Sequence, residues 1–320
     1  MDDKLSNNVL ELRQIVEANL EIPTPADDKP DGSETKASKF IPKSAEPEDP
    51  KEAKIWAYLG VVGGAGVTSL AVQSAWELST SEVDGEKARV LLVDLDFERG
   101  DCAAYLDMET SISIAELNET EGRMDENLAA TFIRRVSPGL SLLSAEAEIG
   151  GNDLLSTNAL LSLLDSVSGL FDYIILDVPP MWRAWTQAVI GAADKFALVT
   201  EARVPALHLT RKMAEDIREA MSLPALPDII LNKHERRSLS GGLSLGDVHK
   251  VLRRDSCSQI VVDDETLRIA INTGKPAGVL KPKSRYTKSV RTHVRTWRNL
   301  EAKTAAKAAP RRRDRRAARS

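Results

Sequence analysis

Short apolar segments alternate with longer amphipathic ones along most of the chain. Six apolar segments, four to eight residues long and set off by glycine, proline or charged residues, predict buried strands at 55–62, 89–93, 140–144, 173–176, 195–200 and 228–231. Helical periodicity predicts helices between them, for example at 68–78, 158–168 and 207–221. Strands that are apolar throughout and alternate with helices are typical of a parallel sheet covered on both faces. The pattern therefore predicts an α/β fold: a mostly parallel twisted sheet with helices on both faces.

The same reading divides the chain into four parts. Residues 1–21 predict a short amphipathic helix, and residues 22–51 are rich in proline, charge and serine, which predicts a disordered acidic linker. Residues 52–300 form one domain, without an internal repeat, and residues 301–320 form a disordered polybasic tail.

The C-terminal end of the domain is both amphipathic and basic. Its apolar residues recur at helical spacing with lysine and arginine between them: Tyr286, Val290, Val294, Trp297 and Leu300. Such a helix either lies on an anionic membrane surface or packs on its own domain, and both remain open. Residues 1–50 carry 12 acidic and 6 basic side chains, whereas residues 275–320 carry 2 and 16. The basic end therefore suits acidic lipid, protein or nucleic acid, or it folds back on the acidic body.

The composition indicates the cell compartment and argues against one class of metal site. The sequence contains no apolar run long enough to span a bilayer, and its first residues do not resemble a signal peptide, so we expect a cytoplasmic protein. Cys102 and Cys257 stand far apart without metal-site spacing. They are typical of ordinary thiols in a reducing compartment, and they disfavour an iron–sulfur site.

A glycine-rich segment follows the first predicted strand and opens a predicted helix. Residues 58–69 read Tyr-Leu-Gly-Val-Val-Gly-Gly-Ala-Gly-Val-Thr-Ser. Gly63, Gly64 and Gly66 permit a tight turn, so that backbone N–H groups and a helix N-terminus surround an anion. The hydroxyl of Thr68 would then be placed to bind Mg²⁺.

Polar residues end three of the later strands. Asp94 and Asp96 close the second strand, Asp177 closes the fourth, and Asn232 follows the last. The carboxyl ends of parallel strands are where open α/β sheets bind ligands. Taken singly, each residue is equally well explained as a polar strand exit, but their order after the glycine loop favours a shared site.

Together these motifs resemble the MinD/ParA superfamily, whose loop reads Lys-Gly-Gly-x-Gly-Lys-Thr/Ser. The resemblance spans residues 54–300. It implies that ATP contacts Gly63, Gly64, Ala65, Gly66, Val67, Thr68, Ser69 and, through its adenine, Asn232. It also implies that Mg²⁺ is held by Thr68, Asp94 and Asp177, and that Asp96 positions the attacking water.

The loop departs from the family pattern at both lysines, which are Val62 and Val67 here. A charge-assisted hydrogen bond contributes roughly 1.5–3 kcal/mol, so losing one lysine would weaken ATP binding about ten- to a hundredfold. Phosphoryl transfer depends on the same charges, so we expect weak or absent hydrolysis. Arg99 or Arg183, in the two switch regions, could replace a lysine. A loop that binds nothing is the alternative.

Residues 182–205, 261–264 and 270–276 resemble the CpaE/TadZ branch in particular. That resemblance implies a homodimeric spatial organiser for Flp pilus or tight-adherence secretion assembly, at a cell pole or peripheral to the inner membrane. The alternatives are a ParA/MinD-type ATPase for partitioning or positioning, and a nucleotide-free scaffold. Nucleic acid is the less favoured partner, since a partitioning ATPase would need the two lysines.

Overall fold

The computed structural model describes residues 52–235 and 243–308. The expected N-terminal helix, the acidic linker and the arginine-rich residues 309–320 lie outside the described residues. The statements that follow concern the unit that begins at Glu52.

The centre of this unit is an eight-stranded sheet in the order β10-β9-β8-β1-β7-β4-β6-β5. All neighbouring strands are parallel except β5, which pairs antiparallel with β6 at one edge. A small antiparallel hairpin, β2–β3, lies outside this sheet. The strands are β1 Lys54–Gly60, β2 Glu82–Val83, β3 Glu86–Lys87, β4 Val90–Asp94, β5 Arg134–Ser137, β6 Leu140–Ser144, β7 Tyr173–Val178, β8 Lys195–Glu201, β9 Asp228–His234 and β10 Ser258–Val261.

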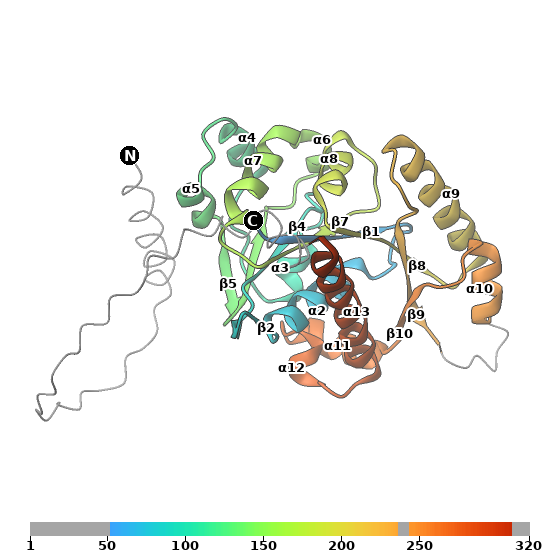
Figure 1. The fold of residues 1–320 in the computed structure, drawn as a ribbon. Helices are drawn as coiled ribbons and strands as arrows, with labels where there is room; N and C mark the ends of the chain where they lie inside the picture. Colours follow the sequence, from blue (N-terminus) through green and yellow to red (C-terminus); the bar gives the residue numbers. More distant parts are fainter. Residues whose placement is uncertain (1–51, 236–242, 309–320) are drawn as a thin grey trace, which may run out of the picture. The chain divides into compact units, whose positions relative to one another are not determined.

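Helices cover both faces of the sheet (Figure 1). The upper layer in that view holds α4 Ile114–Glu119, α5 Glu126–Thr131, α6 Gly151–Leu154, α7 Thr157–Ser168, α8 Ala184–Ala192 and α9 Val204–Ala220. The lower layer holds α2 Val67–Ser79, α3 Asp101–Tyr105, α11 Asp264–Asn272, α12 Ala277–Leu280 and α13 Arg285–Ala308, while α10 Leu245–Leu252 packs against α9. This arrangement confirms the α/β fold predicted from the sequence.

Two large hydrophobic cores result, one on each side of the sheet, and a third, smaller one joins α9, β9 and α10. Successive side chains of a strand point to opposite faces. In β1, Ala57 and Leu59 therefore join the core under α7 and α8, whereas Trp56 and Tyr58 join the core with α2 and α13. Strands β4 and β7 alternate in the same way, which is why their residues before Asp94 and Asp177 are apolar.

The sequence reading missed two edge strands. Strand β5 reads Arg-Arg-Val-Ser and is half exposed, and β10 begins with Ser258 and Gln259 before its buried residues. Edge strands bury one face or less, so they lack the continuous apolar run that identified the central ones.

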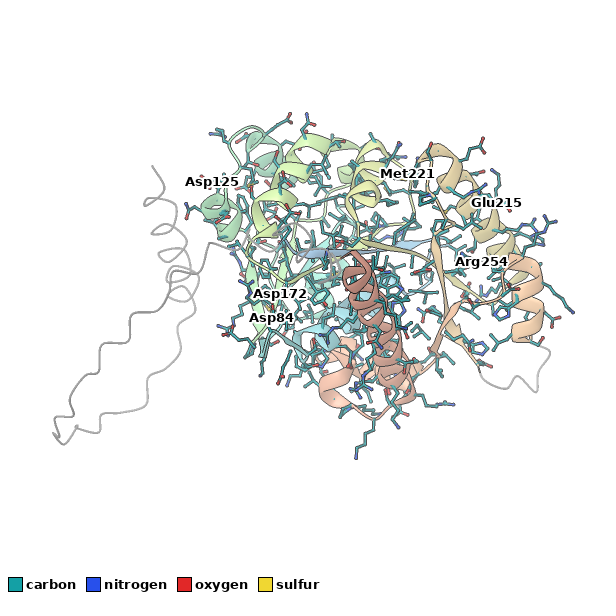
Figure 2. The ribbon with its side chains drawn as sticks, in the orientation of Figure 1. Asp84, Asp125, Asp172, Glu215, Met221 and Arg254 are labelled. Atoms are coloured by element: carbon teal, nitrogen blue, oxygen red, sulfur yellow. The ribbon has the colours of Figure 1, made fainter. Side chains whose placement is uncertain are left out.

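The central strands β4 and β7 are also joined by a side-chain contact just before they begin. The carboxylate of Asp172, labelled in Figure 2, accepts hydrogen bonds from the backbone and the guanidinium of Arg89.

Helix α13 packs on its own domain, which settles one of the two alternatives for its apolar face. Tyr286, Val290, Val294 and Trp297 are at most 3% exposed. The ring of Trp297 stacks on Tyr58 with centroids 5.4 Å apart. A membrane contact through this apolar face, the other alternative, is therefore not available in the structure, because burial against β1 and α2 already removes the face from water.

The helix also runs further than expected. It continues to Ala308, so residues 301–308 belong to a helix and not to a disordered tail. Glu301 explains part of the extension, since its carboxylate accepts a 2.6 Å hydrogen bond from the indole of Trp56. The following residues are mostly alanine and lysine, which favour helix.

Candidate nucleotide-binding site

A tight loop joins β1 to α2 at the carboxyl edge of the sheet. Gly64 and Gly66 have φ of 74° and 82°, a region that side chains disfavour, and helix α2 begins directly at Val67. The N–H of Ala65 donates to the carbonyl of Val62 across the turn, at 3.2 Å. The loop that the glycines predicted is therefore present between a buried strand and a helix N-terminus, where backbone N–H groups can bind an anion.

The two valines of this loop pack as apolar side chains. Val62 contacts both hydrophobic cores, and Val67 contacts the core on the α2 side. A Cβ built on Gly60 would come within 3.0 Å of a methyl group of Val67, so the end of the loop folds back closely over its beginning. Val67 thus offers an apolar side chain and no charge at the start of α2.

Two buried aspartates face each other next to this loop. Asp94 and Asp177 are paired in the register of β4 and β7 and are 1% and 3% exposed. Counting alternate residues along each strand places both on the α2 side of the sheet. Thr68, in the first turn of α2, forms a hydrogen bond with Asp177. The sheet topology therefore brings Thr68, Asp94 and Asp177 together.

The hydrogen bonds described at these carboxylates come from neutral groups. Asp94 accepts from the backbone N–H of Asp96 at 3.0 Å and of Cys102 at 2.9 Å, and from the hydroxyl of Ser144 at 3.4 Å. The thiol of Cys102 donates to Asp177 at 3.4 Å. These bonds position both side chains without compensating their charge.

Burial dominates the electrostatics of the pair. Loss of solvation raises the pKa of Asp94 and of Asp177 above the ordinary carboxyl value, and the mutual repulsion of the two adds to the effect at Asp177. Burial, together with the neighbouring carboxylates, likewise raises the pKa of Cys102, which keeps it a thiol. Two carboxylates and a hydroxyl are oxygen donors of the kind that Mg²⁺ prefers. The residues present therefore fit a magnesium ion.

The ligand atoms of Asp94, Cys102 and Asp177 lie within 4.8 Å of one another, so the thiol stands beside the proposed magnesium ligands. Sequence reasoning assigned Cys102 no role. The signal that could have found it is its place in the first turn of α3, eight residues after Asp94.

Asp96, the candidate for positioning water, is partly buried at the turn that follows β4. Its carboxylate accepts from the N–H of Glu98 at 3.3 Å, and its carbonyl accepts from Arg99 and Gly100. In this structure the side chain of Asp96 therefore caps the turn, two residues after Asp94 in the sequence.

Asn232 lies against the glycine loop at the end of β9. Its amide donates to the carbonyl of Ala65 at 2.7 Å and to that of Gly66 at 3.3 Å, and the residue is 4% exposed. The side chain that we expected at adenine thus fixes the loop backbone. Lys233, which the sequence analysis did not single out, donates from Nζ to the carbonyl of Gly64 at 2.6 Å.

The two arginines considered as substitutes make other interactions in the described residues, so their role at the loop stays a prediction. Arg183 forms an ion pair with Asp153. Arg99 is exposed and acts on the charge of Asp101. Ser69, the last predicted loop contact, instead accepts a 2.7 Å hydrogen bond at its carbonyl from the hydroxyl of Tyr286. Among residues 52–235 and 243–308, the cationic side chain hydrogen-bonded to the loop is that of Lys233.

Comparison with known proteins agrees with this geometry. A family profile described as an AAA domain matches residues 53–223. The septum site-determining protein MinD of Thermotoga maritima is 23% identical over 238 residues, covering 74% of this chain and 84% of that protein. A tyrosine-protein kinase, ptk, of Acinetobacter johnsonii is 32% identical over 94 residues, but the match spans 29% of this chain and only 12% of the kinase.

Solved structures match more of the fold. A ParA family ATPase from Chlorobium tepidum superposes with a TM-score of 0.64 and 22% identity, covering 75% of this chain and 98% of that one. MinD from Pyrococcus horikoshii, solved with Mg-ADP, superposes with a TM-score of 0.63 and 18% identity, covering 78% and 97%. The chain therefore belongs to the AAA domain family and has the fold of the MinD and ParA proteins.

Within the described residues, none of the helices combines the length and the apolar character that crossing a bilayer requires.

Proposed function

We propose that this chain binds ATP with Mg²⁺ at the loop between β1 and α2. The observation that carries the proposal is the shared position of three features: the glycine loop, the N-terminus of α2, and the carboxylates of Asp94 and Asp177 on the same face of the sheet. The β- and γ-phosphates would lie in the loop, and Thr68, Asp94 and Asp177 would hold the metal, directly or through water. The Mg-ADP present in the Pyrococcus MinD structure supports this ligand class.

Binding is weaker than in relatives that carry both lysines, and hydrolysis is slow or absent. Val62 and Val67 pack against apolar cores and bring no charge to the phosphates. The loss of one charge-assisted bond corresponds to roughly a ten- to hundredfold loss in affinity. Charge stabilisation of the transition state decreases at the same time, because phosphoryl transfer relies on the same positions.

The cellular role that we propose is that of a CpaE/TadZ-like spatial organiser. The sequence resemblance in residues 182–205, 261–264 and 270–276 supports this branch. Such a protein forms a homodimer, stands at a cell pole or beneath the inner membrane, and recruits the machinery that assembles Flp-type pili. Contact with an anionic membrane would involve the basic residues beyond Arg298 and not the apolar face of α13, which is buried.

Equilibrium dialysis with labelled ATP, with and without Mg²⁺, tests the biochemical part. We expect Mg²⁺-dependent binding, turnover near the buffer background, and at least tenfold tighter binding by Val67→Lys. Absence of binding by both proteins would favour the nucleotide-free scaffold. Rapid turnover by the unmodified chain would favour a ParA/MinD-type ATPase, which salt-sensitive binding to DNA would support further.

The cellular part is tested by deleting the gene in its host. We expect loss of surface pili and a polar focus for a fluorescent fusion. Normal pili in the deletion strain, together with a defect in chromosome or plasmid inheritance, would replace the pilus assignment by partitioning.

A further inference from the structure

Lys233 stands at the glycine loop although it is 169 residues away from it in sequence. It lies near the end of β9, between the buried Asn232 and the buried His234, and its own side chain is exposed. Its Nζ is 2.6 Å from the carbonyl oxygen of Gly64. Its Cε would be 3.7 Å from a Cβ built on Gly66, so the stem of the side chain runs along the loop.

The backbone at Lys233 aims the side chain in this direction. Its φ of 53° is in the left-handed region, where few residues other than glycine, asparagine and aspartate are found. Asn232, immediately before it, donates two hydrogen bonds to the loop and fixes the end of β9 against Ala65 and Gly66. The ammonium group is therefore held at the loop by the fold and not by a chance surface contact.

The loop needs a cation from outside itself. The first turn of α2 has N–H groups aimed at an anion, its cap is Gly66 without a side chain to accept from them, and no acidic residue stands in that turn. Val62 and Val67 provide no charge there. Lysine acts on phosphate as a compact point charge on a flexible stem, so it can act from a neighbouring strand as well as from the loop.

We propose that Lys233 replaces the missing loop lysine. Its ammonium group leaves the carbonyl of Gly64 and binds the terminal phosphate oxygens of a nucleoside triphosphate in the loop. This inference rests on the proposed function, because it assigns a residue to the same ATP site. Strand β9 thus has two roles at the loop. Asn232 fixes the loop backbone, and the adjacent Lys233 provides the positive charge that contacts the phosphate.

Isothermal titration with ATP and Mg²⁺ tests the proposal on the full chain. Lys233→Met removes the charge but keeps the length of the stem, and we expect it to weaken ATP binding roughly 10- to 100-fold. Lys233→Asn, which tolerates a positive φ, is a second neutral variant, and Lys233→Arg keeps the charge. Lys212→Met is the matched control, because Lys212 is an exposed lysine of α9 that pairs with Asp216. We expect it to bind ATP within about twofold of the unmodified chain.

A second background separates a charge effect from damage to the loop. In Val67→Lys, the loop again has its own lysine, so Lys233→Met should then weaken binding less than about threefold. An equally large loss in both backgrounds would overturn the proposal, because Lys233 would then act by shaping the loop. Unchanged affinity in both neutral variants, with normal unfolding curves, would overturn it while leaving the proposed ATP site intact. Absence of ATP binding by the unmodified chain would overturn both.

Discussion

Protonation of His293 should destabilise this protein between neutral and mildly acidic pH. His293 lies in α13 and is 3% exposed. The hydroxyl of Tyr58 lies 3.2 Å from its Nε2, and that of Ser258 lies 3.3 Å from its Nδ1. The ring of Trp297 lies beside the imidazole at a centroid distance of 4.5 Å. The groups that face the imidazole from β1, from β10 and from its own helix are thus neutral. A charged imidazole would be desolvated without a counter-ion, which lowers the pKa of His293 to about 4 from an ordinary value of 6.5.

The sign and size of the effect follow from linkage. The unfolded chain binds the proton more tightly than the folded one, so the stability is full above pH 6.5, falls as the pH decreases toward 4, and changes no further below that for this group. A shift from 6.5 to about 4 corresponds to roughly 3 kcal/mol in total, of which about 2 kcal/mol is lost by about pH 5.

Urea unfolding at a series of pH values between about 7.5 and 4.5, on the unmodified chain and on His293→Asn, measures this term. Other groups also titrate in that interval, and the buried carboxyls with raised pKa act in the opposite direction. The difference in pH dependence between the two proteins isolates the proton of His293, because the loss of the ring's packing in the variant shifts the stability by the same amount at every pH. Parallel stability curves for the two proteins would refute the reasoning, since the slope would then belong to other groups.

Three further perturbations test the site and its support. Arg291→Met leaves the buried carboxylate of Glu77 without its bidentate partner. Because the side chain of Arg291 is only 34% exposed, the free energy of unfolding should decrease by about 1–3 kcal/mol. Urea unfolding measures this change, and a loss below about 0.5 kcal/mol would contradict the role of the ion pair. Gly66→Ala adds a Cβ that would meet the amide of Asn232 at 2.6 Å in a backbone with φ of 82°, so ATP affinity in titration should decrease at least about tenfold, and unaltered affinity would show that the loop is less constrained. Burial and Asp94 raise the pKa of Asp177 to about 8, so above about pH 8 Asp177→Asn removes one of two like charges buried side by side. The melting temperature without ligand should therefore rise at that pH while the Mg²⁺ dependence of ATP binding decreases, and a lower melting temperature would contradict the repulsion.

Much of this architecture could be predicted from the sequence because it depends on local pattern. The buried strands β1, β4 and β7 consist mainly of apolar residues, and an aspartate stands at or next to the end of β4 and of β7. Parallel strands have their carboxyl ends at the same edge, so Asp94 and Asp177 were expected near the loop, and their register pairs them directly. The edge strand β5 escaped the same reasoning, since half-exposed strands resemble loops in composition.

The parts of the site that escaped prediction depend on contacts between distant residues. A thiol beside two aspartates and a lysine after an asparagine have no periodicity that distinguishes them from ordinary side chains. Cys102 meets Asp177 across 75 residues, and Lys233 meets Gly64 across 169. Arg183, one of the two arginines considered as a substitute for a loop lysine, forms an ion pair with Asp153. The sequence therefore indicated which strand ends and loops lie together, but not which basic side chain contacts the glycine loop.

The two valines and Asn232 show how this loop keeps its shape without a lysine of its own. A loop lysine acts on phosphate only when ligand is present, whereas the two hydrogen bonds from Asn232 to the carbonyls of Ala65 and Gly66 are formed in the ligand-free chain and remain when Lys233 turns to the phosphate. Valine at positions 62 and 67 adds apolar packing to the same loop. The loop is therefore stabilised before the nucleotide arrives, and less of the binding energy is spent on ordering it. A loop that is ordered before binding and has no catalytic lysine suits a protein that holds a nucleotide-bound state and does not cycle through hydrolysis.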